Sequence, residues 1–553
     1  MNFQSLFRKK SVAATHDTGD AHSPQLVRNL NLRDLTFMGI AAIIGAGSFS
    51  SLGQACYSGG PGVVILFIIC AIACGFTALC YAEFASRVPA SGSAYTYAYV
   101  SFGELFAWVI GWALLMEYSI GNIYVAFSWS GYFTNLLDGA GVHMPEWLTI
   151  NYRSASAAFR DGIQGEGFQA WTNAPKIGSL RVIFDLPAFM INVLVTWLVY
   201  VGVNESRKVS NFMVLLKLFI IVVVIVTGAF FIDIDNWTPF MPNGFGGVMG
   251  GAAAVFFAYI GFDAVSTLAE ESKNPMRDLP KGMMYSLMIC TVVYVLLALV
   301  LTGMVSYNAL GVSDPLAEVF KLKGVKWMLY FVSIAAVVAM TSVILVFQLG
   351  QPRIWMSMAR DGLLPKRFAK IHPKYKTPGF STIMTGAVVG IPIFFTDETF
   401  VLDFTSIGTL FAFVLVCGGV LLLPKAEKVE GVKQRFRLPQ INGKWIVPAI
   451  VLVAFALLLN DNSTYTEELF QFNSINLSAK LPMWIFLLLC LIMATMSFLR
   501  NLSLIPVLGV LSCCYLLTGM APSNWLWFGV WLLIGLVFYL LYGFRKSKLA
   551  QSK

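Results

Sequence analysis

Charged residues are scarce in this chain, and their scarcity is the first constraint on its class. Only 12% of the 553 residues are Asp, Glu, Lys or Arg, whereas 57% are hydrophobic and the mean hydropathy is +0.72. A soluble domain has about 25% charged and about 45–50% apolar residues. Because so little charge cannot cover a soluble surface, most of the apolar surface must face lipid. We therefore predict an all-α polytopic membrane protein.

The chain also has few of the residues that enzymes and metal sites use. We find no nucleophile–base set and no phosphate-binding P-loop, which argues against an enzyme and against a primary pump. The nine cysteines lie mostly inside apolar segments and none lies in the loop 135–181, so we expect neither a disulfide framework nor a zinc site. We expect no metal and no cofactor. The four histidines all lie outside the apolar segments: His16, His22, His143 and His372.

Apolar segments long enough to cross a bilayer recur along the chain. The segments 380–396 and 445–460 are short, so we expect 12–14 transmembrane helices. The polar first 27 residues argue against a cleaved signal peptide. The fourteen segments fall at 36–57, 62–88, 99–134, 182–203, 209–232, 247–270, 282–305, 325–350, 380–396, 401–423, 445–460, 482–499, 502–519 and 524–543.

Basic residues are distributed unevenly between the loops. If the N-terminus is cytoplasmic, the cytoplasmic segments hold 29 of the 38 Lys and Arg residues, the external loops hold 8, and Lys217 lies inside a span. This positive-inside bias predicts a multi-pass protein of the cell (plasma or inner) membrane with both termini in the cytoplasm. The net charge of +9 then reflects topology and contact with anionic membrane lipids, not nucleic acid. The polar loop 135–181 is expected to form a small extracellular cap or helix.

Two spans contain small residues that would interrupt a membrane helix. The first reads FMGIAAIIGAGSFSSLGQA, and the sixth reads GGVMGGAAAVFFAYIGFDAVSTLAEES. Close helix packing explains such residues as well as local unwinding does. If the helices unwind, their backbone groups need a cavity or a ligand. Interrupted helices five segments apart are typical of inverted-repeat transporters, and free N–H and carbonyl groups at two such breaks suit a zwitterion such as an α-amino acid.

Three charged residues in the spans are candidates for a function in transport: Lys217, Glu117 and Asp263. Lys217 is about 9 residues, or roughly 13 Å, from the cytoplasmic end of its helix, close to the middle of a ~30 Å core. It either snorkels to the headgroups or lies on an ion or substrate pathway. Glu117, deep in the third span, is either a structural carboxylate bonded to Ser, Tyr or Asn122, or a coupling group. For Asp263, beside the second interruption, we favour stabilisation of unwound backbone over proton movement.

Four stretches resemble the amino acid–polyamine–organocation superfamily, more narrowly its cationic amino acid transporter branch and the bacterial homologues of that branch. They are GIAAIIGAGSFSSLG, GWALLMEYSIG, FFAYIGFDAVSTLAEESKNPMRDLPKG and QPRIWMSMARDGLLP, and the resemblance covers roughly residues 28–425. It implies a LeuT-type 5+5 inverted-repeat fold with discontinuous helices 1 and 6 and about four peripheral C-terminal helices. We accordingly expect a cytoplasmic tail at 1–30, a transporter core at 31–425 with repeats at about 31–235 and 240–425, peripheral helices at 426–545 and a tail at 546–553.

The resemblance also implies where substrate and protons bind. In proton-coupled relatives, a lysine on the fifth helix occupies the place where sodium binds in sodium-coupled ones, and Lys217 matches that position. Removal from water favours the neutral amine, so such a lysine can release and regain a proton. The implied proton-coupling residues are Lys217, Glu117 and Asp263. The implied substrate-binding residues, with Phe257 as an outer lid, are Ile43, Ile44, Gly45, Ala46, Gly47, Ser48, Phe256, Phe257, Ala258, Ile260 and Met340.

These features predict secondary active transport of amino acids by proton-coupled symport, with an amino acid substrate, protons and membrane lipids as partners. Met340 would fill space beside the substrate side chain, which favours small neutral L-amino acids such as alanine, unless it only fills the core. An exchanger, or a cationic amino acid transporter without net proton coupling, fits the same features. A membrane nutrient receptor or a channel is the alternative from another class, although no pore motif or ring of charge is visible. A small membrane-protein partner is compatible with the sequence but not identified by it.

Overall fold

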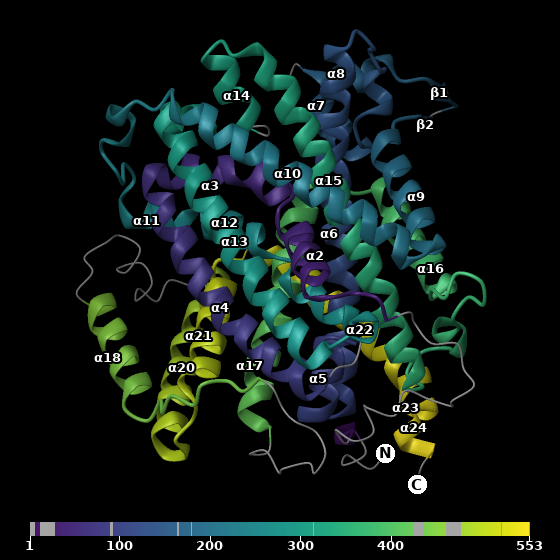
Figure 1. Cartoon of the computed structure of the whole chain (residues 1–553), viewed down its shortest axis with the longest axis vertical. Helices are drawn as coiled ribbons and strands as arrows, with labels where there is room; N and C mark the ends of the chain where they lie inside the picture. Colours follow the sequence, from purple (N-terminus) through teal and green to yellow (C-terminus); the bar gives the residue numbers. More distant parts are fainter. Residues whose placement is uncertain are drawn as a thin grey trace.

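The computed structural model describes residues 6–10, 28–88, 92–162, 165–178, 180–312, 315–423, 436–459, 477–520 and 522–551. It is a helical protein with one two-residue strand pair in the described part (Figure 1). Its helices are α2 (Leu32–Ile43), α3 (Leu52–Gly59), α4 (Val63–Arg87), α5 (Ala94–Ser101), α6 (Glu104–Gly139), α7 (Tyr152–Arg160), α8 (Glu166–Asn173), α9 (Leu186–Val201), α10 (Val203–Ala229), α11 (Gly244–Gly250), α12 (Ala252–Tyr259), α13 (Pro275–Met304), α14 (Pro315–Leu322), α15 (Lys326–Arg360), α16 (Gly379–Ile393), α17 (Glu398–Leu422), α18 (Ile446–Leu459), α20 (Leu477–Arg500), α21 (Leu504–Thr518), α22 (Pro522–Phe538), α23 (Phe544–Lys546) and α24 (Lys548–Gln551).

Each of the fourteen apolar segments predicted from the sequence contains helix, which confirms the all-α polytopic class. Among the described residues, eight helical stretches are long and apolar enough to cross a membrane. The shorter apolar helices α9, α16, α18 and α21 have 10–17 residues. The first and sixth segments are interrupted, so their separate pieces are shorter than a span. The predicted segment 99–134 is also divided, because Gly103, with φ +106°, separates α5 from α6.

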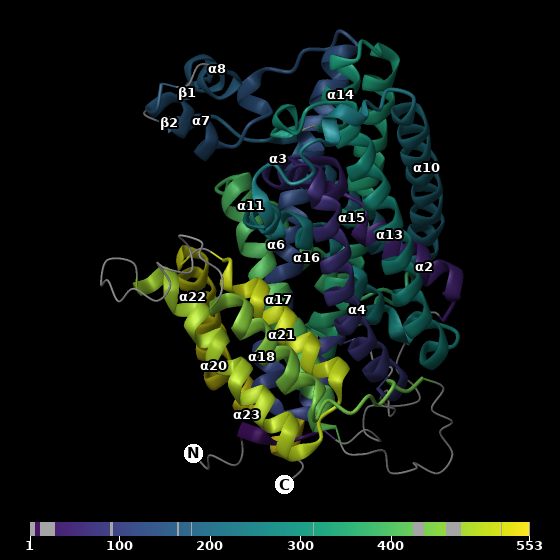
Figure 2. The same ribbon diagram turned by 90° about the vertical axis from the view of Figure 1, so that its left-hand side faces the viewer.

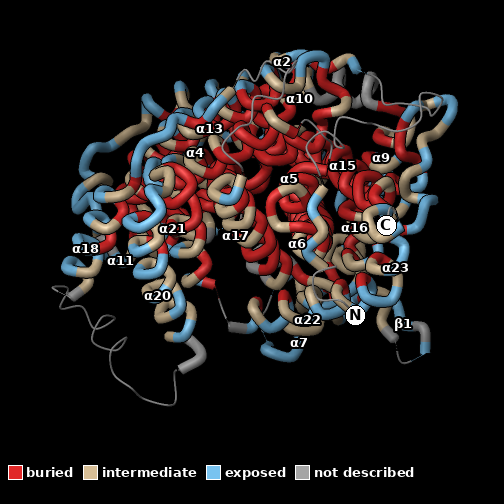
Figure 3. The backbone as a smooth tube through the Cα atoms, turned by 90° about the horizontal axis from the view of Figure 1, so that it is seen from below, coloured by how far each residue is buried: buried red, intermediate tan, exposed pale blue. Residues whose placement is uncertain are grey.

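The interior is formed by long helices that pack on several sides at once. The helix α15 packs against α6, α10 and α2, and α13 packs against α2 and α4. Figure 3 shows the buried residues concentrated around α4, α5, α6, α15 and α17, with exposed residues along the outer helices. In a membrane protein such exposed apolar faces contact lipid, so burial here marks the helices that line the centre of the molecule.

The predicted loop 135–181 begins later than expected, because α6 continues to Gly139. The described residues between α6 and α9 form a separate cap at one end of the molecule (Figure 2). It holds α7, α8 and the strand pair β1 (Lys176–Ile177) and β2 (Leu180–Arg181) around a small apolar core with Ala155 and Ala170. Arg153 Nε lies 2.8 Å from Asp397 Oδ2, and Asp397 caps the start of α17. The cap is therefore tied to the helix core, and both chain ends lie on the opposite face, which we call the terminal face (Figures 1 and 2).

The C-terminal helix α22 is fixed to α6 by indole side chains. Trp112 and Trp531 stack with ring centroids 4.8 Å apart, and each indole N–H donates to the backbone carbonyl of the other residue, at 2.9 and 3.0 Å. Trp108 Nε1 donates to Gly535 O at 2.8 Å. Because an indole N–H in an apolar environment needs an acceptor, these three bonds give α22 a defined register on α6.

Candidate substrate and coupling site

The first interruption is a real break in the helix. The helix α2 starts with a capping box in which Asn31 and Asp34 bond to each other's backbone N–H groups, and it ends at Ile43. Ile44 is extended (φ −80°, ψ 99°), and a π-helical turn at Gly47–Ser51 leads into α3. The last helical bond of α2 runs from Ile44 N to Ile40 O at 3.0 Å. The carbonyl groups after Ile40 lie at the helix end, where such groups are available to other donors.

The second interruption lies directly against the first. The helix α12 ends before Ile260, which is extended, and Gly261 has φ +115° before a 3-10 helix, η6 (Phe262–Glu271). A Cβ atom on Gly261 would lie 2.8 Å from Ala42 Cβ, and one on Gly47 would lie 2.5 Å from Ala258 Cα. The glycines therefore permit the two broken helices to touch backbone to backbone.

Lys217 reaches the first break from α10. Its side chain is fully buried, and Nζ donates to the carbonyl oxygens of Ile44 (2.7 Å), Ile40 (3.1 Å) and Ala41 (3.2 Å). It also donates to Ser342 Oγ of α15 at 2.9 Å. The amine thus remains inside the helix bundle instead of extending to a headgroup region. Within the described residues, Lys217 forms no ion pair, so oxygen dipoles alone stabilise its charge.

Two residues that sequence reasoning missed complete this region. Ser342 is the hydroxyl partner of Lys217, and Tyr294 of α13 joins the two breaks. The Tyr294 hydroxyl lies 2.9 Å from both Ile43 O and Ala258 O, one carbonyl on each interrupted helix. The available signal was weak: each is a single polar side chain within a mostly apolar span, and nothing in the spacing says what it contacts.

The residues expected to bind substrate surround these breaks, and all those whose burial is described are buried. The Phe257 ring contacts Tyr124 edge to face, with centroids 4.9 Å apart. Val343, on α15 beside Ser342, lies so close to Gly45 that a Cβ there would meet its Cγ2 at 2.3 Å. Met340 is three residues earlier on the same helix and is completely buried. The buried members of the set are Ile43, Ile44, Gly45, Ala46, Gly47, Ser48, Phe256, Phe257, Ala258, Ile260 and Met340.

Glu117 and Asp263 form a second, separate polar group. Both are buried, and they are near enough to interact electrostatically. Tyr118 OH donates to Asp263 Oδ2 at 3.2 Å, and Asp263 Oδ1 has no partner among the described residues. Neither carboxylate oxygen of Glu117 makes a hydrogen bond of good geometry in the described structure, so the expected bonds to Ser, Asn122 or Tyr are not formed. Among the described residues, neither acid forms an ion pair or a hydrogen bond with Lys217.

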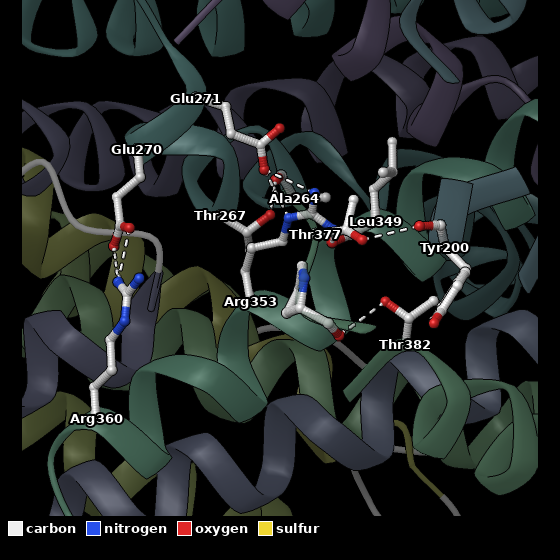
Figure 4. A network of polar contacts seen from close by, with 11 residues as sticks. Tyr200, Ala264, Thr267, Glu270, Glu271, Leu349, Arg353, Arg360, Thr377 and Thr382 are labelled. Atoms are coloured by element: carbon white, nitrogen blue, oxygen red, sulfur yellow. Dashed lines mark hydrogen bonds and ion pairs between the residues drawn. The ribbon is translucent and has the colours of Figure 1, made fainter. Parts of the chain in front are cut away.

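Two ion pairs join η6 to α15 toward the terminal face (Figure 4). Arg353 lies 2.8 Å from Glu271, and both side chains are almost completely buried. Arg360 lies 2.7 Å from Glu270, in a more exposed position. These pairs therefore join η6, which continues the second break, to α15, which carries Ser342.

The contact between the breaks yields a first prediction. We expect Gly261→Ala to reduce both transport and the unfolding temperature, because the new methyl group would overlap the Ala42 backbone and the positive φ would cost about 1–3 kcal/mol. Gly75→Ala is the control, since a Cβ at Gly75 meets nothing within 4 Å. Uptake assays and thermal unfolding of the purified protein measure both effects. Unchanged behaviour of Gly261→Ala would show that the breaks do not need this close approach.

The fold and the site define a polytopic membrane protein with two apposed helix breaks and a buried lysine. The amino acid permease family profile matches residues 30–496, and the profile for the C-terminus of these permeases matches residues 502–547. The chain therefore belongs to the amino acid permease family, in the cationic amino acid transporter branch of the superfamily predicted from the motifs.

Relatives of known name resemble the chain over most of its length. The branched-chain amino acid permease BcaP of Bacillus subtilis is 38% identical over 557 residues, covering 99% of both chains. The methylthioribose transporter of the same species is 40% identical over 457 residues, covering 82% of this chain and 92% of the relative. Human cationic amino acid transporter 4 is 30% identical over 591 residues, covering 96% of this chain and 89% of the relative.

Proposed function

We propose that this permease is a proton-coupled symporter of neutral L-amino acids with small apolar side chains, with the terminal face toward the cytoplasm of a plasma or inner membrane. The observation that carries the proposal is the position of the Lys217 amine. It is buried, it lies on the carbonyls of the first break, and no described carboxylate pairs with it. A charge in such a place is costly and typical of ion pathways.

The proposed coupling follows from what the amine does to the break. When protonated, Lys217 shares its three N–H donors among the carbonyls of Ile40 and Ala41 in α2, the Ile44 carbonyl in the break and the Ser342 hydroxyl. It so holds α2, α10 and α15 together. A neutral amine has one donor fewer and no charge, so its attraction for the carbonyl dipoles is weaker. Loss of the proton would therefore loosen the broken helix and its substrate contacts, which links proton release to substrate release.

Glu117 and Asp263 are proposed to support proton movement, Glu117 by exchanging a proton and Asp263 by stabilising the structure around it. Two neighbouring buried carboxyl groups repel each other when both are ionised, so the pair favours sharing a proton. Asp263 sits at the start of η6 and accepts from Tyr118, which supports the structural role that we favoured for it. Glu117 has unsatisfied oxygens and is the better candidate to exchange a proton.

The lining around the breaks favours a neutral substrate. Phe257, Ile260, Met340 and Val343 are apolar, and Lys217 is directed at backbone oxygens. A long cationic side chain would find no described partner there other than the acidic pair, which lies apart from Lys217. The relative named a branched-chain amino acid permease, similar from end to end, supports a neutral apolar side chain.

Uptake by purified protein in sodium-free proteoliposomes tests the proposal. With an imposed pH gradient, acid outside, labelled alanine should accumulate above its external concentration, and collapsing the gradient should release it. A requirement for sodium, or uptake that ignores the gradient, would rule out symport. Strict dependence on internal amino acid would support the exchanger instead.

Met340 gives a prediction about specificity. We expect Met340→Ala to increase uptake of longer neutral amino acids relative to alanine by about tenfold or more, since one methylene is worth about 10–200-fold in a fitted apolar pocket. Met328→Ala is the control, because Met328 is equally buried on the same helix but lies more than three turns from Met340. Competition of unlabelled leucine and methionine against labelled alanine measures the change. An unaltered ranking would mean that Met340 only fills the core.

A further inference from the structure

The two ends of the chain meet on the terminal face. The N-terminal segment (residues 6–10) and the C-terminal segment (residues 539–551) lie close enough for the Arg8 guanidinium to stand 5.5 Å from the centre of the Phe544 ring. Both segments lie apart from the interrupted elements α2–α3 and α12–η6 (Figures 1 and 2). Their contacts nevertheless converge on two acidic residues of the core, Glu104 and Asp361.

Glu104 is held mainly by the C-terminal segment. It is the first residue of α6 and is completely buried. Its Oε1 accepts from Tyr539 OH at 2.9 Å, and its Oε2 accepts from Ser547 Oγ at 2.5 Å and from Tyr99 OH at 2.9 Å. A buried carboxylate needs such donors. The C-terminal segment supplies two of the three, so it is part of what makes this burial possible.

Asp361 is held by both ends. Lys10 Nζ lies 2.6 Å from Asp361 Oδ1, and Tyr95 OH donates to Oδ2 at 2.8 Å. The backbone N–H of Lys548 donates to the Asp361 carbonyl at 3.0 Å. The N-terminal segment is further fixed by backbone bonds, from Glu104 N to Arg8 O (2.9 Å) and from Lys10 N to Tyr99 O (3.3 Å). Both terminal segments are therefore bound to the core by backbone hydrogen bonds as well as by side chains.

Two glycines with positive φ make room for these strips. A Cβ on Gly103 (φ +106°) would lie 2.8 Å from the Phe7 carbonyl carbon, and a Cβ on Gly362 (φ +83°) would lie 2.5 Å from the Lys546 carbonyl oxygen. At both crossing points the core therefore has a glycine, whose positive φ and lack of a side chain let the terminal segment pass close to the backbone.

The residues bound by the two segments lie next to residues that contact η6. Asp361 directly follows Arg360, which pairs with Glu270 of η6. Tyr95 lies two residues after Ser93, whose hydroxyl accepts from Ser266 of η6 at 2.6 Å. We propose that the two chain ends form a clasp on α5 and α15 that keeps η6 closed against α15, and that its release accompanies opening of this face during transport. The clasp rests on the proposed transport function for its purpose, but its contacts do not depend on it.

Hydrogen–deuterium exchange of the purified full-length protein tests the clasp without any transport measurement. We expect Lys10→Met to speed exchange of residues 262–278 and 92–101 by about three- to tenfold, because Asp361 loses its charged partner. Lys9→Met is the matched control: the same substitution one residue away, at an exposed side chain. Wild-type exchange in Lys10→Met, or equal acceleration in both variants, would overturn the proposal.

Ser547→Ala tests the C-terminal half of the clasp without a change in charge. It removes one donor from buried Glu104, and we expect about tenfold faster exchange in residues 539–551 together with faster exchange in 262–278. The middle of α6 should exchange as in the wild type, which shows that the variant is folded. If residues 539–551 loosen while 262–278 do not change, the tail is bound but does not act on the gate, and the clasp is rejected. A protein that fails the sodium-free uptake test but shows these exchange changes would retain the clasp and lose only the symport function.

Discussion

Lys217→Ala is expected to abolish pH-driven accumulation of amino acid. One proton moving through about 100 mV supplies ~2.3 kcal/mol, which supports roughly a 40-fold gradient of a neutral solute. The variant removes the amine that binds Ile40, Ala41 and Ile44 at the first break. Accumulation ratios in sodium-free proteoliposomes, acid outside, should therefore fall to about one-fold, the value for transport without coupling.

The control for Lys217→Ala is Lys281→Ala, which removes an exposed lysine near the start of α13. It should accumulate substrate as the wild type does. Downhill uptake by Lys217→Ala, with an unchanged gel-filtration profile, would separate lost coupling from lost folding. Full pH-dependent accumulation by the variant would remove Lys217 from the mechanism.

The second large effect is expected at the ion pair between Arg353 and Glu271. Arg353→Leu leaves the Glu271 carboxylate buried without its partner, and breaking such a pair costs about 3–5 kcal/mol. Arg353 Nε donates to Glu271 Oε1 at 2.8 Å, and both side chains are at most 1% exposed. Thermal unfolding of the purified protein should show a large decrease in the unfolding temperature.

Two further variants make this result specific. Arg360→Leu breaks the neighbouring ion pair, in which the side chains of Arg360 and Glu270 are 30% and 12% exposed. It should change the free energy of unfolding by only about 0–1 kcal/mol. Combining Arg353→Leu with Glu271→Leu removes both buried charges and should restore much of the stability. If this stable double variant transports at the wild-type rate, the pair is structural and not a gate. A stable Arg353→Leu single variant would contradict the argument from burial.

Much of the fold could be predicted because its determinants are local. The length of the apolar segments predicted the helices, and the glycine-rich stretches predicted the two interruptions. Glu83 lies four residues before Arg87 in the sequence, a spacing that places two side chains on one helix face, and the structure pairs them. The division at Gly103 was missed because an apolar run continues on both sides of it, and only the positive φ of that residue separates the helices.

The site was less predictable, because its contacts join residues far apart in the chain. The sequence singled out Lys217 by its cost in a membrane, but its partner Ser342 is 125 residues away. Tyr294 bridges residues 251 and 36 positions away, at Ile43 and Ala258. Such partners depend on how helices cross, which hydrophobicity does not encode. That neither Glu117 nor Asp263 pairs with Lys217 has the same origin, since the sequence marks all three as charged residues within spans but does not say which of them meet.

The indole hydrogen bonds between α22 and α6 indicate which helices move together during transport. Because Trp108, Trp112 and Trp531 lock α22 to the helix that carries Glu117, the C-terminal helix should stay stationary with α6 while the discontinuous helices rock past it. The unit formed by α22 and α6 would then stay fixed while the interrupted helices change position against it. A probe on α22 and one on α6 should keep a constant separation through the cycle, and distances from either of them to η6 should change.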